Sequence, residues 1–81
     1  MKKQKRNPRK SFVDSVAQEV LAGLSEEDKE FIRNNPDPIG YHFSLGLYIR
    51  NKYIYEGYPD CESPDDLSGE IIERIIALLR K

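Results

Sequence analysis

The final stretch of the sequence, PDDLSGEIIERIIALLRK (64–81), constrains the fold more than any other part of the chain. Its apolar residues recur every three or four positions, which is the spacing of one face of an α-helix. Seven apolar residues form this face, and together they cover about half of the helix circumference: Leu67, Ile71, Ile72, Ile75, Ile76, Leu78 and Leu79. A core built from only 81 residues is expected to leave part of this arc uncovered, and an uncovered arc predicts self-association.

The rest of the sequence also predicts helices. A first helix is expected over 11–23 with Ser11 as its cap, and a short second helix after Ser25, anchored by Phe31 and Ile32 and stopped by NNPDP (34–38). A third is expected from Pro38 through IGYHFSLGLYIRNKYIY, although its tyrosines and isoleucines would also suit a strand. Helix is preferred because this segment is longer than a usual strand and does not alternate polar with apolar residues. The predicted fold is a small all-α bundle of four helices.

Charge divides the chain at residue 10. Residues 1–10 contain six Lys or Arg and no acid, whereas 11–81 contain seven basic and fourteen acidic residues. We therefore expect a flexible basic tail over 1–10 and a single helical domain over 11–81. The tail is interpreted either as a solvated leader or as a nucleic-acid contact, which would use six cations: Lys2, Lys3, Lys5, Arg6, Arg9 and Lys10. The acidic domain disfavours the second interpretation, because it would repel the same phosphates.

Composition also limits the cellular setting and the possible cofactors. No run approaches the roughly 18 to 20 apolar residues that a membrane span needs, and the N-terminus lacks the apolar core of a signal peptide. Cys61 is the only cysteine, so no internal disulfide can form, which favours a cytoplasmic location. One cysteine and one histidine exclude an ordinary four-ligand zinc site within one chain. No cofactor is expected.

The segment SLGLYIRNKYIY (44–55) places Arg50 in an otherwise mostly apolar and aromatic run. On a helix, Arg50 falls on one stripe with Phe43, Leu47 and Ile54, whereas Ser44, Asn51 and Lys52 point away. A buried guanidinium needs a partner, because arginine does not lose its proton. We expect a bidentate pair with Asp65 or Asp66, with Gly46 leaving room for it. The alternatives are that Arg50 extends its head to water or binds a ligand.

Two motifs carry a resemblance to a known family. HFSLGLYIRN (42–51) followed by PDDLSGEII (64–72) resembles a family of small bacterial and phage-associated domains of unknown function. The matching pattern is HFxLGxxxRN, an aromatic residue at Tyr53, then PDDLS. The resemblance favours treating both motifs as one unit, whose polar residues are the candidate binding residues: His42, Arg50, Asn51, Asp65, Asp66 and Ser68. It implies no activity.

Simpler structural roles are also expected for these residues. His42 is interpreted as a hydrogen-bonded residue at the edge of the apolar face, and Asp65 and Asp66 as acids of a helix's first turn. An enzyme would require a pocket that joins His42, Arg50 and an acid, and we do not expect one. The predicted function is a protein-interaction or oligomerisation module. The alternative is a nucleic-acid accessory domain that uses the basic tail.

Overall fold

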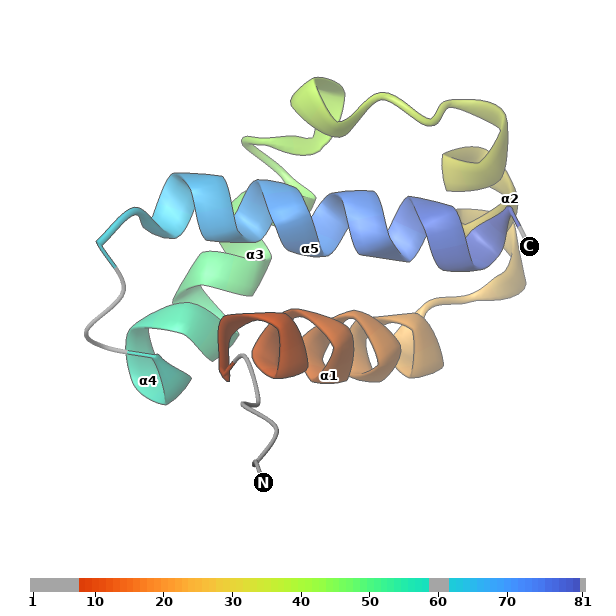
Figure 1. The fold of residues 1–81 in the computed structure, drawn as a ribbon. Helices are drawn as coiled ribbons and strands as arrows, with labels where there is room; N and C mark the ends of the chain where they lie inside the picture. Colours follow the sequence, from red (N-terminus) through yellow and green to blue (C-terminus); the bar gives the residue numbers. More distant parts are fainter. Residues whose placement is uncertain (1–7, 59–61, 81) are drawn as a thin grey trace.

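The computed structural model describes residues 8–58 and 62–80, and every regular element in these two stretches is helical (Figure 1). The small all-α bundle is therefore confirmed. Cys61 and the predicted tail cations at positions 2, 3, 5 and 6 lie outside the described residues. In chain order the elements are α1 (Pro8–Gly23), α2 (Glu26–Asn34), the 3₁₀ helix η1 (Pro38–Tyr41), α3 (Leu45–Ile49), the π-helix η2 (Arg50–Ile54), α4 (Tyr55–Gly57) and α5 (Pro64–Leu79).

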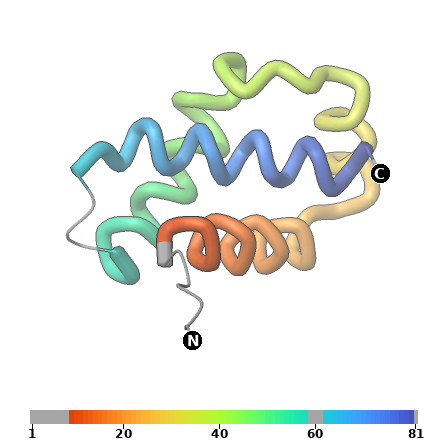
Figure 2. The backbone as a smooth tube through the Cα atoms, in the orientation of Figure 1, coloured from red at the N-terminus to blue at the C-terminus, as the bar shows by residue number. Residues whose placement is uncertain are grey.

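Helix α5 lies in the middle of the molecule (Figures 1 and 2). It contacts α1, α2, η1, α3 and η2. The chain crosses the molecule along α1, turns at α2, returns through η1 on the other side of α5, and then enters α3. Helices α1 and α5 consequently run side by side in the same direction, although they are far apart in the sequence.

The apolar arc of α5 is covered by these neighbours. Leu67, Ile71 and Ile75 are fully buried, and Ile72 is 1% exposed. The opposing core side chains come from the other helices: Val13, Val16, Ala17, Val20, Ile32, Ile49 and Ile54. The central helix has partners on several sides, so the arc is covered from Leu67 to Ile76, and only Leu78 and Leu79 at its end stay partly exposed. Burial of this kind stabilises by about 1.5–3 kcal/mol for each large aliphatic side chain.

Helix α1 begins one turn earlier than its sequence predicts. Its first residue is Pro8, whose fixed φ suits a first helical turn, so Ser11 lies inside the helix instead of capping it. Arg9 and Lys10, assigned above to the tail, are thus part of this helix. Arg9 is bound to α5, since its Nη2 lies 2.6 Å from Glu70 Oε2.

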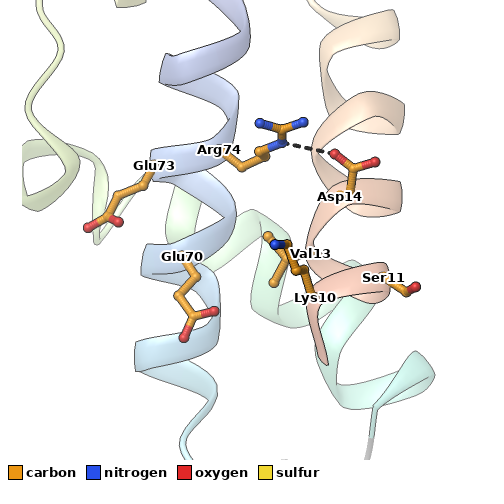
Figure 3. Close-up of a pocket in the computed structure, with 7 residues that line it drawn as sticks. All are labelled: Lys10, Ser11, Val13, Asp14, Glu70, Glu73 and Arg74. Atoms are coloured by element: carbon orange, nitrogen blue, oxygen red, sulfur yellow. Dashed lines mark hydrogen bonds and ion pairs between the residues drawn. The ribbon is translucent and has the colours of Figure 1, made fainter. Parts of the chain in front are cut away.

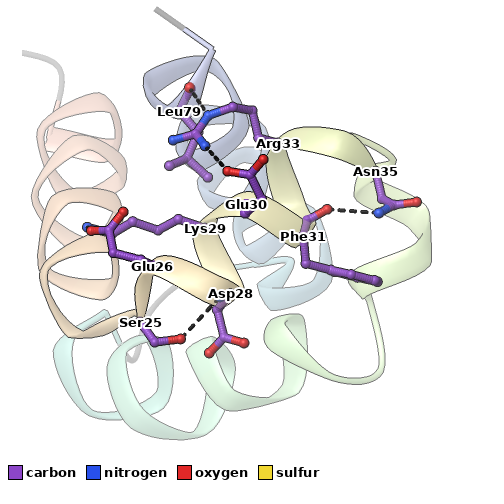
Figure 4. Close-up of polar contacts among 9 residues, drawn as sticks. All are labelled: Ser25, Glu26, Asp28, Lys29, Glu30, Phe31, Arg33, Asn35 and Leu79. Atoms are coloured by element: carbon purple, nitrogen blue, oxygen red, sulfur yellow. Dashed lines mark hydrogen bonds and ion pairs between the residues drawn. The ribbon is translucent and has the colours of Figure 1, made fainter.

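Helix α2 has the predicted cap and is attached to the end of α5 (Figure 4). Ser25 Oγ accepts a hydrogen bond from the Asp28 N–H at 3.1 Å, and three acids occupy the first turn, near the positive end of the helix dipole. Arg33 Nε donates to the Leu79 carbonyl at 3.0 Å. Ile32 is buried, but Phe31 is mainly exposed, so only one of the two predicted anchors reaches the core.

The predicted third helix is interrupted. Its start is the 3₁₀ turn η1, where the Asp37 side chain accepts from the Ile39 N–H at 3.2 Å. Ser44 then leaves the helical conformation, with φ −110° and ψ −85°, and an uninterrupted helical stretch follows from Leu45 to Gly57. Phe43 therefore precedes the helix and does not belong to the predicted stripe. Leu47 also is exposed, at the edge of a buried face that contains Gly46, Ile49 and Arg50.

The middle of this stretch is a π-helix. In η2 the Tyr55 N–H donates to the Arg50 carbonyl, a bond of the i→i+5 type. Arg50 and Ile54 face the core, whereas Asn51 and Lys52 are exposed, as predicted. Short π segments within helices occur frequently at functional sites, so this one marks a region of interest.

Candidate functional site

The predicted site is centred on the guanidinium of Arg50, which is carried into the molecule between η2 and α5. Arg50 is 5% exposed. Its Nη1 donates to Ser68 Oγ at 3.0 Å, and its Nη2 donates to the His42 carbonyl at 3.3 Å. Ser68 is fully buried and donates in turn to the Asp65 carbonyl at 2.9 Å. The buried cation is thus linked through one hydroxyl to the backbone of the first turn of α5.

The carboxylate that faces Arg50 is that of Asp65, but the contact is not the predicted bidentate pair. A single contact joins Arg50 Nε to Asp65 Oδ1 at 3.5 Å, and the Asp65 side chain is 68% exposed. A charge-assisted N–H···O bond is normally about 2.7–2.9 Å long, so this ion pair is loose. Asp66 is exposed and belongs to the cap of α5, where its N–H donates to Ser63 Oγ at 3.4 Å.

Electrostatics explain why acidic residues occupy the first turn of α5 beside Arg50. The first turn of a helix carries partial positive charge, which would repel a guanidinium placed beside it. Asp65 and Asp66 supply negative charge at that turn. Ser68 and the His42 carbonyl satisfy the hydrogen bonds of Arg50, and the Asp65 carboxylate is the acid paired with it in the described residues.

Gly46 provides the space that Arg50 occupies, as its position in the sequence predicted. A Cβ atom at Gly46 would lie 3.1 Å from Arg50 Nη1 and 3.3 Å from the Tyr41 carbonyl oxygen. Few real Cβ contacts are so close, so an alanine there would push against both the guanidinium and the backbone. The glycine is needed for close approach and not for an unusual φ angle.

The six candidate residues do not form one open site. Arg50, Asp65, Ser68 and the backbone of His42 meet, whereas Asn51 is exposed on the outer side of η2 and Asp66 is occupied with its cap. The His42 ring is half-buried and packs edge-on against Phe43, with centroids 4.7 Å apart. Every buried side-chain nitrogen and oxygen of the described residues has a partner. This cluster joins η2 to the first turn of α5, and the Asp65 carboxylate is its solvent-exposed charged group.

Five exposed large apolar side chains fall within one stretch of the sequence, which the sequence pattern missed. Phe43 and Ile39 are 84% and 83% exposed, and Leu47, Tyr48 and Tyr55 are about half exposed. All five belong to the interrupted segment from η1 to α4. The break at Ser44, which shifts the helical phase, is the feature that turns Phe43 outward.

A shallow groove of about 760 Å³ lies between α1 and α5 (Figure 3). Most of its lining is charged, with both signs present: Lys10, Ser11, Val13, Asp14, Glu70, Glu73 and Arg74. Arg74 Nε donates to Asp14 Oδ1 at 2.9 Å, so part of this charge is paired across the two helices. Exposed pairs of this kind contribute about 0–1 kcal/mol each, and here they fix α1 against α5.

A second groove, of about 430 Å³, separates α1 from α3 and η2. One edge carries Tyr48, Lys52 and Tyr53, with the Lys52 ammonium over both rings at 5.7 and 5.6 Å from their centroids. Burial, followed by the charge of Glu19, raises the pKa of Tyr53. The spacing of Tyr48 and Lys52, one helical turn apart, is the sequence signal that would have found this cluster.

Two kinds of site are absent from the described part of the chain. No three His, Cys, Asp or Glu side chains in residues 8–58 and 62–80 are grouped so that they could hold a metal ion. Within the same residues no helix has the length and apolar character required to cross a bilayer.

Comparison of the chain with protein-family models, with curated proteins and with solved structures finds no match. The resemblance carried by HFSLGLYIRN and PDDLSGEII therefore stays a prediction.

Proposed function

We propose that this domain is a protein-interaction module whose docking surface is built from the outward side chains of residues 39–55. The observation that carries the proposal is the exposure of Phe43 and Ile39, which are more than four-fifths accessible to solvent. Large apolar side chains in such a position cost solvation free energy, and a group of them is typical of a surface that a partner covers.

The covered arc of α5 supports the same conclusion indirectly. Because the core cluster is formed without Ile39, Phe43 and Leu47, these exposed residues are not needed to close it. The Arg50 cluster then has a supporting role, since it fixes the helix that carries Leu47 and Tyr48 against α5. The single cysteine in the sequence favours a cytoplasmic setting for this interaction.

Association can be tested with Phe43→Ser and a matched control. Phe31→Ser makes the same chemical change at another exposed phenylalanine, on α2 and outside residues 39–55. We expect light scattering over a wide concentration range, or capture of a partner from solution, to show association that Phe43→Ser weakens at least about fivefold and Phe31→Ser leaves unchanged. Equal association of all three proteins would contradict the proposal.

The second candidate function is nucleic-acid binding through the basic N-terminal residues. Two of the six cations lie in α1, and one of them, Arg9, is bound to Glu70. This contact competes with phosphate, so the other five cations, at positions 2, 3, 5, 6 and 10, would have to carry most of the affinity. Deleting residues 1–7, which removes four of these cations, should then strongly weaken salt-sensitive binding of DNA or RNA. Unchanged binding after the deletion would exclude the tail.

A further inference from the structure

The 430 Å³ groove between α1 and η2 adjoins the proposed docking surface, because Tyr48 belongs to both. Its apolar lining comes from both sides of the groove: Val20, Leu24 and Leu45. The volume falls near the lower end of the range for ligand sites, about 300–1,000 Å³. A groove of this size accommodates one bulky side chain and its backbone better than a long segment.

The polar edge of the groove holds a cation in a fixed position. The rings of Tyr48 and Tyr53 are 6.2 Å apart at an interplanar angle of 78°, and the Lys52 ammonium lies over both. A hydrogen bond with Tyr48 is the main cause that raises the pKa of Lys52 above its ordinary value, at which a lysine is already charged at neutral pH. Contact with two aromatic faces also restricts where the flexible lysine chain can place that charge.

Glu19 is the only acid among the residues that line this groove in the described part of the chain. It is exposed on α1, and its charge is the smallest of the causes that raise the pKa of Lys52. An anion that binds at the Lys52 edge of the groove would be attracted by Lys52 and opposed by Glu19 across the groove.

We propose that this groove binds the C-terminal residue of a partner protein, with the α-carboxylate on Lys52 and an aliphatic side chain against Val20, Leu24 and Leu45. A C-terminal leucine or isoleucine carries a carboxylate and an apolar side chain on one Cα atom, which matches the cation and the apolar lining of so small a groove. The inference rests on the proposed function, since it names the partner chemistry for one edge of the same surface.

The test is an NMR titration of the 81-residue protein with N-acetyl-leucine, with N-acetyl-leucinamide as the uncharged control. We expect saturable shifts of the Lys52 and Tyr53 amides. The amide probe, and the Lys52→Gln variant with the acid probe, should bind about two- to fivefold more weakly, the range for an exposed charge pair. Glu19→Gln should bind about twofold more tightly, since it removes the opposing charge. Lys29→Gln, on α2, is the matched control and should bind as the unmodified protein does.

Several results would overturn this inference. Equal binding of the acid and the amide would remove the role of the carboxylate, and saturable shifts confined to amides outside the groove, or no saturable shift, would remove the site. These titrations do not involve Phe43, so their failure is distinguishable from failure of Phe43→Ser to change association.

Discussion

Replacing Ser68 by alanine should destabilise the domain, and most of the loss should depend on Arg50. Ser68 is fully buried and accepts from Arg50 Nη1 at 3.0 Å. Its removal leaves a guanidinium N–H buried without a partner, which costs about 1.5–3 kcal/mol. Asp65→Asn should cost less than about 1 kcal/mol, because the Asp65 carboxylate is mainly exposed and 3.5 Å from Nε. The hydroxyl should therefore matter more than the carboxylate.

Two double-mutant cycles measure this difference. Each combines Arg50→Met with one partner substitution, and the free energy of unfolding is obtained from urea titrations followed by far-ultraviolet circular dichroism. We expect a coupling energy of about 1–2 kcal/mol between Arg50 and Ser68, and less than about 0.5–1 kcal/mol between Arg50 and Asp65. If the Asp65 coupling equals or exceeds the Ser68 coupling, the assignment of the hydroxyl as the main partner is refuted.

Two further perturbations follow from the same geometry. Gly46→Ala should lower the free energy of unfolding by about 1–3 kcal/mol, because its Cβ displaces Arg50. Gly69→Ala, whose Cβ would enter open space on α5, is the control and should raise it by up to about 1 kcal/mol in the same urea assay. A gain at both positions would show that Gly46 is not crowded by Arg50. Burial and then the charge of Asp37 raise the pKa of Tyr41, so its stabilising contribution is complete below about pH 10 and is lost as the pH rises through the folded-state pKa. Tyr41→Phe should cost about 1 kcal/mol at pH 7, because its hydroxyl donates to the Asn35 carbonyl, and should reduce the loss of stability above pH 10; an unchanged alkaline profile would contradict this.

The helices that follow a regular pattern could be predicted from the sequence, and the interrupted one could not. Helix α5 has a long apolar period, a proline in its first turn and Ser63 as its cap, and each of these favours the same element. The segment from Pro38 to Gly57 contains a 3₁₀ turn, a break at Ser44 and a π-helix. Those features are decided by packing against α5, and local propensity does not encode them.

The cluster around Arg50 could also be predicted only in part, because its contacts are decided by tertiary packing. Burial of Arg50 and the need for Gly46 follow from helical geometry and from the size of a guanidinium. The hydrogen-bond partners of Arg50 could not be predicted, because they are the backbone carbonyl of His42 and the hydroxyl of Ser68. The sequence pattern does not indicate which donor such neutral acceptors bind. A pattern of charged residues points to Asp65, but it cannot show that the carboxylate stays largely in solvent.

The parallel pairing of α1 with α5 has a consequence for how the chain folds. The two helices pack along their lengths, and Arg74 bonds to Asp14 across 60 positions of sequence. Contacts with such a separation form slowly compared with those in bundles of sequential hairpins, because a long loop must close first. During synthesis the apolar side chains of α1 therefore stay uncovered until α5 has left the ribosome, which makes the nascent chain a candidate for chaperone binding.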